Sequence, residues 1–192
     1  MRAEFSNFQF SNFQFAMATL YTIGHSTRSL EELVEALRAH DIKLLVDIRS
    51  IPASRRLPHF NRESLERELP ERGIEYLWMK ELGGRRKKLR DDSPNKALRS
   101  DSFRNYADHM LTPEFQHAAA ELVRRAEEKP LAYMCAERVW FHCHRMMVSD
   151  YLVAHGHDVL HIDAAGPART HTLMQVARIK DGQLIYDGEE LF

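Results

Sequence analysis

Both cysteines of this 192-residue chain lie in one short segment that also carries a carboxylate, two histidines and an arginine. Residues 135–137 (Cys-Ala-Glu) follow an apolar run, and residues 142–145 (His-Cys-His-Arg) precede a helical pattern. Thiols, imidazoles and carboxylates serve as nucleophiles, as proton donors and acceptors, and as metal ligands. Open α/β sheets place their ligand crevices where strands give way to helices. The segment therefore predicts a site, but it leaves the reaction open.

Cys135 is a candidate nucleophile. It would need a lowered pKa, which His142, His144, Arg145 or a helix N-terminus could supply. Protein tyrosine phosphatases carry an arginine six residues after their cysteine, and here that position is Phe141, which disfavours phosphatase chemistry of that type. The structural alternative is a small buried residue at the end of a core strand, because a free cysteine packs like a hydrophobic side chain.

A metal site is a second hypothesis for the same segment. Thiolates and imidazoles bind zinc and iron, and Cys135, His142 and Cys143 are the candidate ligands. The wider pool of ligands adds His25, His144 and His161. The spacing is not that of a Cys-x-x-Cys motif, so whether a metal is bound stays open, and no other cofactor is evident.

The chain alternates strand-like and helix-like patterns, which predicts an α/β fold. The fold class is a single domain with a mostly parallel, twisted, Rossmann-like sheet of about five strands, helices on both faces and a C-terminal β-hairpin. Strands are predicted at 20–23, 42–46, 74–79, 131–134 and 159–162, and the hairpin at 178–186. Helices are predicted after the Ser29 and Asn61 caps, in short turns at 102–111, at 112–129 and from about 143 to 155, while 172–177 fits helix or strand.

In such a fold the carboxyl ends of the parallel strands share one edge of the sheet, and chemically active residues follow four of the strands. We expect catalytic roles for His25, Asp47, Cys135, Glu137 and His144. We expect Ser26, Arg49, Arg55 and Arg145 to bind substrate, since arginines clamp phosphate or carboxylate groups. For Arg145 the alternative is an ion pair with Glu137 or Asp47 that ties the loops together.

The net charge is −1, which gives no global attraction to nucleic acid or to an acidic membrane. A local basic run, formed by Arg85, Arg86, Lys87, Lys88 and Arg90, is a candidate contact for nucleic-acid phosphates, although two aspartates follow it and no aromatic platform accompanies it. No run approaches the roughly 18 apolar residues that a membrane span needs. Two cysteines are too few for a disulfide scaffold, so we expect a cytoplasmic protein; its oligomeric state stays open.

The N-terminus repeats the segment Phe-Ser-Asn-Phe-Gln at residues 5–9 and 10–14, shortly before Met17. Polar interruptions exclude a signal peptide of the usual kind. Residues 1–18 are therefore interpreted as an extended or disordered leader, with Met17 as an alternative start or, less simply, as a strand that pairs at a sheet edge. Residues 19–165 form the predicted α/β domain, and 166–192 its C-terminal extension.

Several separate motifs, in order, match one known pattern: Thr22–Ser26 (TIGHS), Asp47-Ile-Arg49, Leu82-Gly-Gly84, Met134–Glu137 (MCAE) and Cys143-His-Arg145. The chain thus resembles the family catalogued as domain of unknown function 488, which occurs mostly in bacteria and archaea. The resemblance covers about residues 20–163. It implies a compact α/β domain with no settled activity, and it marks the motif positions without giving each a role. Trp140 and Phe141 depart from the common pattern.

These observations favour an enzyme, a hydrolase or transferase, that acts on a small anionic, phosphorylated or nucleotide-like substrate. Arg49 and Arg145 would hold the anion, and Glu137 or Asp47 would transfer protons. The alternatives are a nucleic-acid binding or processing module and a Cys/His metal-binding protein.

Overall fold

A six-stranded sheet in the order β3-β2-β4-β1-β5-β6 forms the centre of the molecule, which a computed structural model describes for residues 17–188. The pairs β2–β3, β2–β4, β1–β4 and β1–β5 are parallel, and only β6 runs antiparallel to its neighbour. The predicted mostly parallel sheet is thereby confirmed, with one short strand more than the sequence indicated. The interpretation of residues 1–16 as a leader lies outside the described residues.

The strands of the main sheet are β1 (Thr19–Gly24), β2 (Leu44–Asp47), β3 (Glu75–Trp78), β4 (Leu131–Cys135), β5 (Asp158–Ile162) and β6 (Arg169–Thr170). The α-helices are α1 (Leu30–Arg38), α2 (Arg62–Glu68), α3 (Asp101–Met110), α4 (Pro113–Glu128) and α5 (Arg145–Ala154). Short 3-10 turns occur at η1 (Pro58–Phe60), η2 (Pro70–Arg72), η3 (Lys80–Leu82) and η4 (Trp140–His142), and β7 (Ala177–Lys180) pairs with β8 (Gln183–Tyr186).

Helix α1 shows why the local sequence folds as predicted. The Ser29 hydroxyl accepts the backbone N–H of Glu32 at 3.1 Å, and the Glu32 carboxylate accepts the backbone N–H of Ser29 at 2.7 Å. This capping box satisfies donors that the first helical turn leaves free. Leu30, Leu33 and Leu37, at three- and four-residue spacing, are all buried against the sheet.

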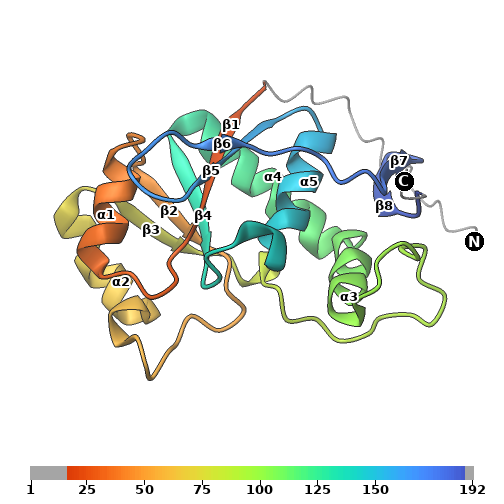
Figure 1. The fold of residues 1–192 in the computed structure, drawn as a ribbon, viewed down its shortest axis with the longest axis horizontal. Helices are drawn as coiled ribbons and strands as arrows, with labels where there is room; N and C mark the ends of the chain where they lie inside the picture. Colours follow the sequence, from red (N-terminus) through yellow and green to blue (C-terminus); the bar gives the residue numbers. More distant parts are fainter. Residues whose placement is uncertain (1–16, 189–192) are drawn as a thin grey trace, which may run out of the picture.

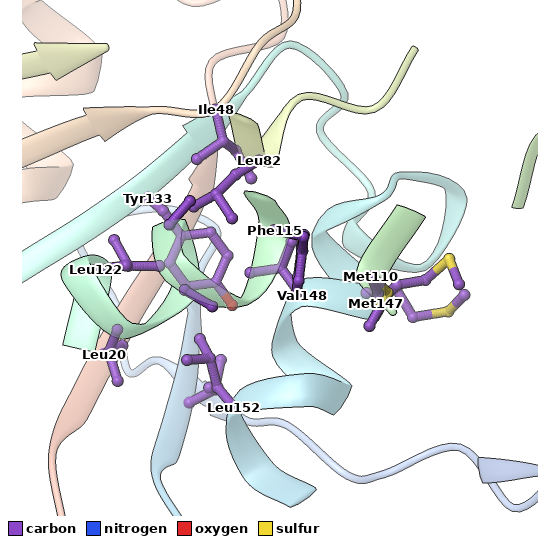
Figure 2. Packing of buried hydrophobic residues seen from close by; sticks show 14 of the residues in the cluster. Leu20, Ile48, Leu82, Met110, Phe115, Leu122, Tyr133, Met147, Val148 and Leu152 are labelled. Carbon is purple, nitrogen blue, oxygen red and sulfur yellow. The ribbon is translucent and has the colours of Figure 1, made fainter. Parts of the chain in front are cut away.

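Helices cover both faces of the sheet, as predicted. On one face α1 and α2 pack against β1, β2 and β4, while α4 and α5 cover the other, with α3 beyond them (Figure 1). The second core is the larger one, and in Figure 2 the Tyr133 ring of β4 lies among side chains such as Leu20, Leu122 and Leu152. Successive residues of a strand point to opposite faces, so Met134 packs on the α1/α2 side and Cys135 on the α4/α5 side.

Some predicted boundaries were wrong. Helix α5 begins at Arg145 rather than near Cys143, because Cys143 has extended backbone with φ −128° and ψ 152°. Residues 172–176 are neither helix nor strand. Asn61 stands at the N-cap of α2, but its side chain accepts the backbone N–H of Ser54 at 2.6 Å instead of capping the helix. The turns expected at 102–111 are one regular helix, α3.

The C-terminal hairpin is confirmed, and its turn has Asp181 and Gly182 at positive φ of 50° and 74°. It packs onto the larger core through Leu184 and Tyr186. The backbone of Tyr186 also bonds to the loop before α3, through the Asn95 side chain and the Ala97 N–H. Among the described residues, no helix has both the length and the apolar character that crossing a bilayer requires.

Candidate functional site

The ends of β1, β2 and β4 lie side by side and bring the sequence motifs together. In the parallel register Gly24 stands opposite Cys135, and Asp47 stands opposite Met134. The backbone N–H of His25 donates to the carbonyl oxygen of Cys135 at 3.0 Å. A Cβ atom on Gly24 would come within 1.9 Å of the Glu137 carbonyl oxygen, so only glycine lets the β1 and β4 ends approach this closely.

Three potential metal ligands meet just beyond β4. The Sγ atoms of Cys135 and Cys143 and a ring nitrogen of His144 all lie within 4.8 Å of one another, and all three residues are buried. Cys135 is the last residue of β4, while Cys143 and His144 lie between η4 and α5. His142, which the sequence suggested as a ligand, is exposed and lines a neighbouring cavity instead.

The orientation of the His144 ring is fixed by the end of β2. Its Nε2 lies 3.1 Å from the carbonyl oxygen of Ile48, and because a carbonyl only accepts, Nε2 must carry the proton. In the neutral ring Nδ1 then holds a lone pair. Nδ1 lies 3.5 Å from the sulfur of Cys143 and 3.8 Å from that of Cys135. An imidazole held by a carbonyl on one nitrogen, with the other nitrogen free to coordinate, is the usual second-shell arrangement of a metal ligand.

These distances can be compared with those of a tetrahedral metal centre. Zinc–sulfur bonds of about 2.3 Å and zinc–nitrogen bonds of about 2.05 Å place a sulfur and a nitrogen ligand about 3.6 Å apart. The two observed sulfur–nitrogen distances, 3.5 and 3.8 Å, lie on either side of that value. An S–H···N hydrogen bond also fits such a distance, but one Nδ1 lone pair accepts one hydrogen, while two sulfurs approach it here.

The two thiols are electrostatically unequal. The pKa of Cys143 is lowered, chiefly by a hydrogen bond from the Cys135 thiol and then by His144 and Arg145, against the effect of burial. The pKa of Cys135 is raised by the same hydrogen bond and by burial. The pair therefore favours a thiolate on Cys143, the form in which cysteine attacks or binds a metal.

A cavity of about 360 Å³ opens onto this cluster. Its wall includes both cysteines and His144, together with Arg49, Arg85, Glu137 and His142, and the aromatic rings of Phe103 and Tyr106. Arg85 and Glu137 are exposed, so a cation and a carboxylate stand beside the buried Cys/His group. The cavity has the composition expected of a site for a small polar ligand.

A second polar cluster lies directly behind the cavity. Asp47, which has no exposed surface, accepts bonds from Nε and Nη2 of Arg49 and from the Tyr76 hydroxyl at 2.8 Å. Nη1 of Arg49 lies 3.3 Å from His25 Nε2, and the His25 ring stacks on Phe60. Burial and the charge of Arg49 lower the pKa of His25 to about 4, so the ring is neutral at neutral pH.

Arg49 connects the two clusters, since it lines the cavity and holds Asp47. Its Nη2 also donates to the Phe60 carbonyl at 2.7 Å, so most of its donors are already used. His25 and Asp47 point toward the α1/α2 side of the sheet, whereas the Cys/His group lies on the α4/α5 side. The strand-end motifs thus converge at one edge of the sheet but form two adjoining clusters.

The remaining residues with a predicted binding role lie elsewhere. Ser26, with a positive φ of 52°, lines a different cavity with Arg28 and Arg138. Arg55 is exposed and lines none of the cavities described for residues 17–188. The guanidinium of Arg145 donates to the carbonyl oxygens of Glu137 and Arg138 and to the Thr22 hydroxyl, and it borders a third cavity. It ties the loops together, as the alternative interpretation held, but through carbonyls instead of carboxylates.

The basic run is partly occupied by contacts within the chain. Arg86 donates to the carbonyl oxygens of Lys80, Glu81 and Gly83, and Lys88 pairs with Asp91 at 2.6 Å. Arg85 is exposed at the mouth of the cavity, and Lys87 and Arg90 are exposed as well. Nucleic-acid contact through these residues stays a prediction.

Several contributors to the site were not identified from the sequence. The Ile48 carbonyl leaves no trace in a side-chain pattern. Gly84 was noted only as part of a motif, yet a Cβ there would lie 2.5 Å from His144 Nδ1 and 2.7 Å from its Cγ. Tyr106 is fully buried, packs edge-on to the His144 ring with centroids 5.2 Å apart, and donates its hydroxyl to the Leu82 carbonyl.

Comparison with known proteins identifies one family. Residues 29–152 match the model of the family described as "Domain of unknown function DUF488". The matched region contains Asp47, Arg49 and the Cys/His cluster, while His25 and Ser26 precede it. Searches of curated proteins and of solved structures gave no match.

Proposed function

We propose that this chain, which belongs to the DUF488 family of domains of unknown function, is a metal-dependent hydrolase or transferase that acts on a small anionic, phosphorylated or nucleotide-like substrate. Cys135, Cys143 and His144 would hold a zinc ion, and the adjoining cavity would receive the substrate. The observation that carries the proposal is the approach of both sulfurs to the single unprotonated nitrogen of His144.

The ligand set favours zinc and a catalytic role. Two thiolates and one imidazole are typical zinc ligands, and three protein ligands leave the fourth tetrahedral position to water or substrate. When bound in such a site, zinc polarises a substrate oxygen or lowers the pKa of a water molecule to about 7. The fourth position would face the cavity, because all three ligands line it.

The other residues of the cavity support an anionic substrate. Arg85 is exposed at the mouth, and none of the ion pairs found among residues 17–188 includes it. Its charge is therefore available to a phosphate or carboxylate group. Arg49 adds a second guanidinium to the wall, although Asp47 offsets its charge. Glu137 is the carboxylate of the cavity and our candidate for proton transfer to or from the substrate.

Cobalt substitution tests the proposal in steps. Cobalt(II) bound by two thiolates and one imidazole should give intense sulfur-to-metal charge-transfer absorption, and addition of inorganic phosphate should shift the visible bands if the fourth position is open. Protein with an absorption typical of hexahydrated cobalt would contradict the proposed ligands. Bands that do not respond to phosphate would instead support a closed, structural metal site.

Turnover is tested on the zinc-loaded protein with a panel of phosphate esters and nucleotides. The Arg85→Ser variant should raise KM for an anionic substrate about tenfold and change kcat little, since a uniform binding contact is removed. Arg56→Ser, an exposed arginine outside the cavity, is the matched control. A panel on which neither the zinc-loaded nor the metal-free protein acts would count against an enzyme of this substrate class.

A further inference from the structure

The segment 136–145 divides its side chains between two cavities. Glu137 and His142 line the cavity at the Cys/His cluster, whereas Arg138, Trp140 and Phe141 line another of about 460 Å³. Arg145, His161 and Arg169 complete the polar part of this second cavity, and Pro167 adds to its apolar part. The proposed metal-dependent function makes no use of this space.

Arg145 is a buried cation without an anionic partner. Only 1 % of its surface is exposed, and its Nη1 and Nη2 atoms donate to neutral oxygens of Thr22, Glu137 and Arg138. Its Nε is buried with no hydrogen-bond partner, and the ion pairs found among residues 17–188 do not include it. A buried charge is costly unless a counter-charge compensates it, so an anion beside Arg145 would be strongly favoured.

His161, in the same cavity wall, ends a buried hydrogen-bonded chain. The carboxylate of Asp150 accepts from the Tyr186 hydroxyl at 3.1 Å and faces His171 Nε2 at 2.8 Å. His171 Nδ1 in turn lies 2.9 Å from His161 Nε2. With both rings neutral, each histidine donates toward Asp150, and the Nδ1 of His161 is left as a lone pair that needs a donor. That Nδ1 is buried and has no partner.

The rest of the wall adds further charge and an apolar surface. Arg169 is exposed at the rim, while Arg138 is paired with Asp163 at 3.0 Å. Trp140 stacks on the His161 ring with centroids 4.2 Å apart and planes 9° apart, and Phe141 is half exposed beside it. Carbon–hydrogen faces of a small organic molecule pack well against such rings.

We propose that this second cavity binds a small organic anion that carries a hydroxyl group, of the hydroxy-acid or sugar-phosphate class. The anionic group supplies the counter-charge that Arg145 lacks, with Arg169 at the rim. The hydroxyl supplies, directly or through one water, the hydrogen that His161 Nδ1 lacks. The inference does not depend on a metal at the Cys/His cluster.

A fluorescence titration tests the inference with a local reporter. The chain has two tryptophans, so the Trp78→Phe variant leaves Trp140, in the cavity wall, as the sole one. Glucose 6-phosphate and lactate represent the two ligand classes, glucose lacks the charge, and sulfate lacks the hydroxyl. We expect saturable quenching by one of the two hydroxylated anions, with binding at least about tenfold weaker for glucose and for sulfate. No saturable response to either hydroxylated anion would overturn the inference.

Substitutions in the wall give the second arm, measured by calorimetry on the otherwise native chain. Arg145→Gln should weaken binding about tenfold or more and Arg169→Ser about threefold, because one removes a buried charge and the other a rim charge. Arg56→Ser, exposed and outside the cavity, should bind like the parent. If Arg145→Gln does not fold, Arg169→Ser decides, and unchanged affinity there contradicts the site. A Cys143→Ser background should bind equally well, which separates this outcome from failure of the metal proposal.

Discussion

His144 Nε2 is hydrogen-bonded to the carbonyl oxygen of Ile48, a residue 96 positions earlier in the chain, at 3.1 Å. This bond joins the segment before α5 to the end of β2 and fixes which ring nitrogen can coordinate. It also orients the other nitrogen, Nδ1, toward two sulfurs. The proposed metal site therefore depends on the sheet as well as on its three ligands.

Gly84 keeps space for that ring, and an added methyl group should disturb it. A Cβ at Gly84 would lie 2.5 Å from His144 Nδ1, closer than van der Waals contact allows. We expect Gly84→Ala to reduce zinc affinity about 10- to 100-fold, in the range seen when outer contacts of a metal ligand are lost. Competition with a chromogenic zinc chelator measures this affinity. Gly166→Ala, where a Cβ meets no atom within 4 Å, is the control, and equal affinities for the two variants would refute the role of Gly84.

The buried Asp47–Arg49 pair should be a large source of stability. Neither residue is more than 6 % exposed, and Asp47 also accepts from Tyr76. Asp47→Asn leaves the Arg49 charge buried without its partner, so the free energy of unfolding should fall by about 3–5 kcal/mol. Urea denaturation followed by circular dichroism measures the change.

An exposed ion pair on α2 provides the comparison for Asp47→Asn. Arg62 and Glu66 are 41 % and 43 % exposed and lie four residues apart on the helix. Glu66→Gln should therefore cost no more than about 0.5 kcal/mol. Similar losses for Glu66→Gln and Asp47→Asn would show that the buried pair has no special weight.

Stability should fall as the solution becomes acidic, in part because of His161. Burial, then the charges of His171 and Arg145, lower its pKa from 6.5 to about 3 in the folded chain. Between these two values the unfolded chain binds the extra proton, so the free energy of unfolding decreases as pH falls from 6.5 toward 3. The His161→Phe variant lacks this group. We expect its loss of stability between pH 6.5 and 4.5 to be smaller than that of the parent by about 1–2 kcal/mol. Parallel stability curves would contradict the assignment.

Much of the fold could be predicted because local signals and periodicity agree. Ser29 and Glu32 form a capping box, Thr112 and Pro113 begin α4, and Asp181-Gly182 makes the hairpin turn. The short strand β6 has no such signal, because its two residues pair only through contacts with β5. Helix α5 begins later than its pattern suggests, since the backbone of Cys143 is extended by its place beside Cys135 and His144.

The site was predictable in outline but not in its partition. Alternation of strands and helices places His25, Asp47 and Cys135 at one edge of the sheet, and this the structure confirms. Strand parity then decides which face each side chain meets, and it separates Asp47 from Cys135. The choice of His144 over His142 as the ring near the sulfurs depends on the Ile48 carbonyl. A chain such as Asp150–His171–His161 is assembled by tertiary contacts alone.

The metal content of protein purified without chelator tests the central claim most directly. Elemental analysis should find about one zinc per chain in the parent and in His142→Gln, whose exposed ring borders the cavity but lies outside the ligand set. Cys135→Ser, Cys143→Ser and His144→Gln, each checked for folding by circular dichroism, should lose most of it. A parent without stoichiometric metal that also fails to take up added zinc, or folded ligand variants that retain it, would contradict the account.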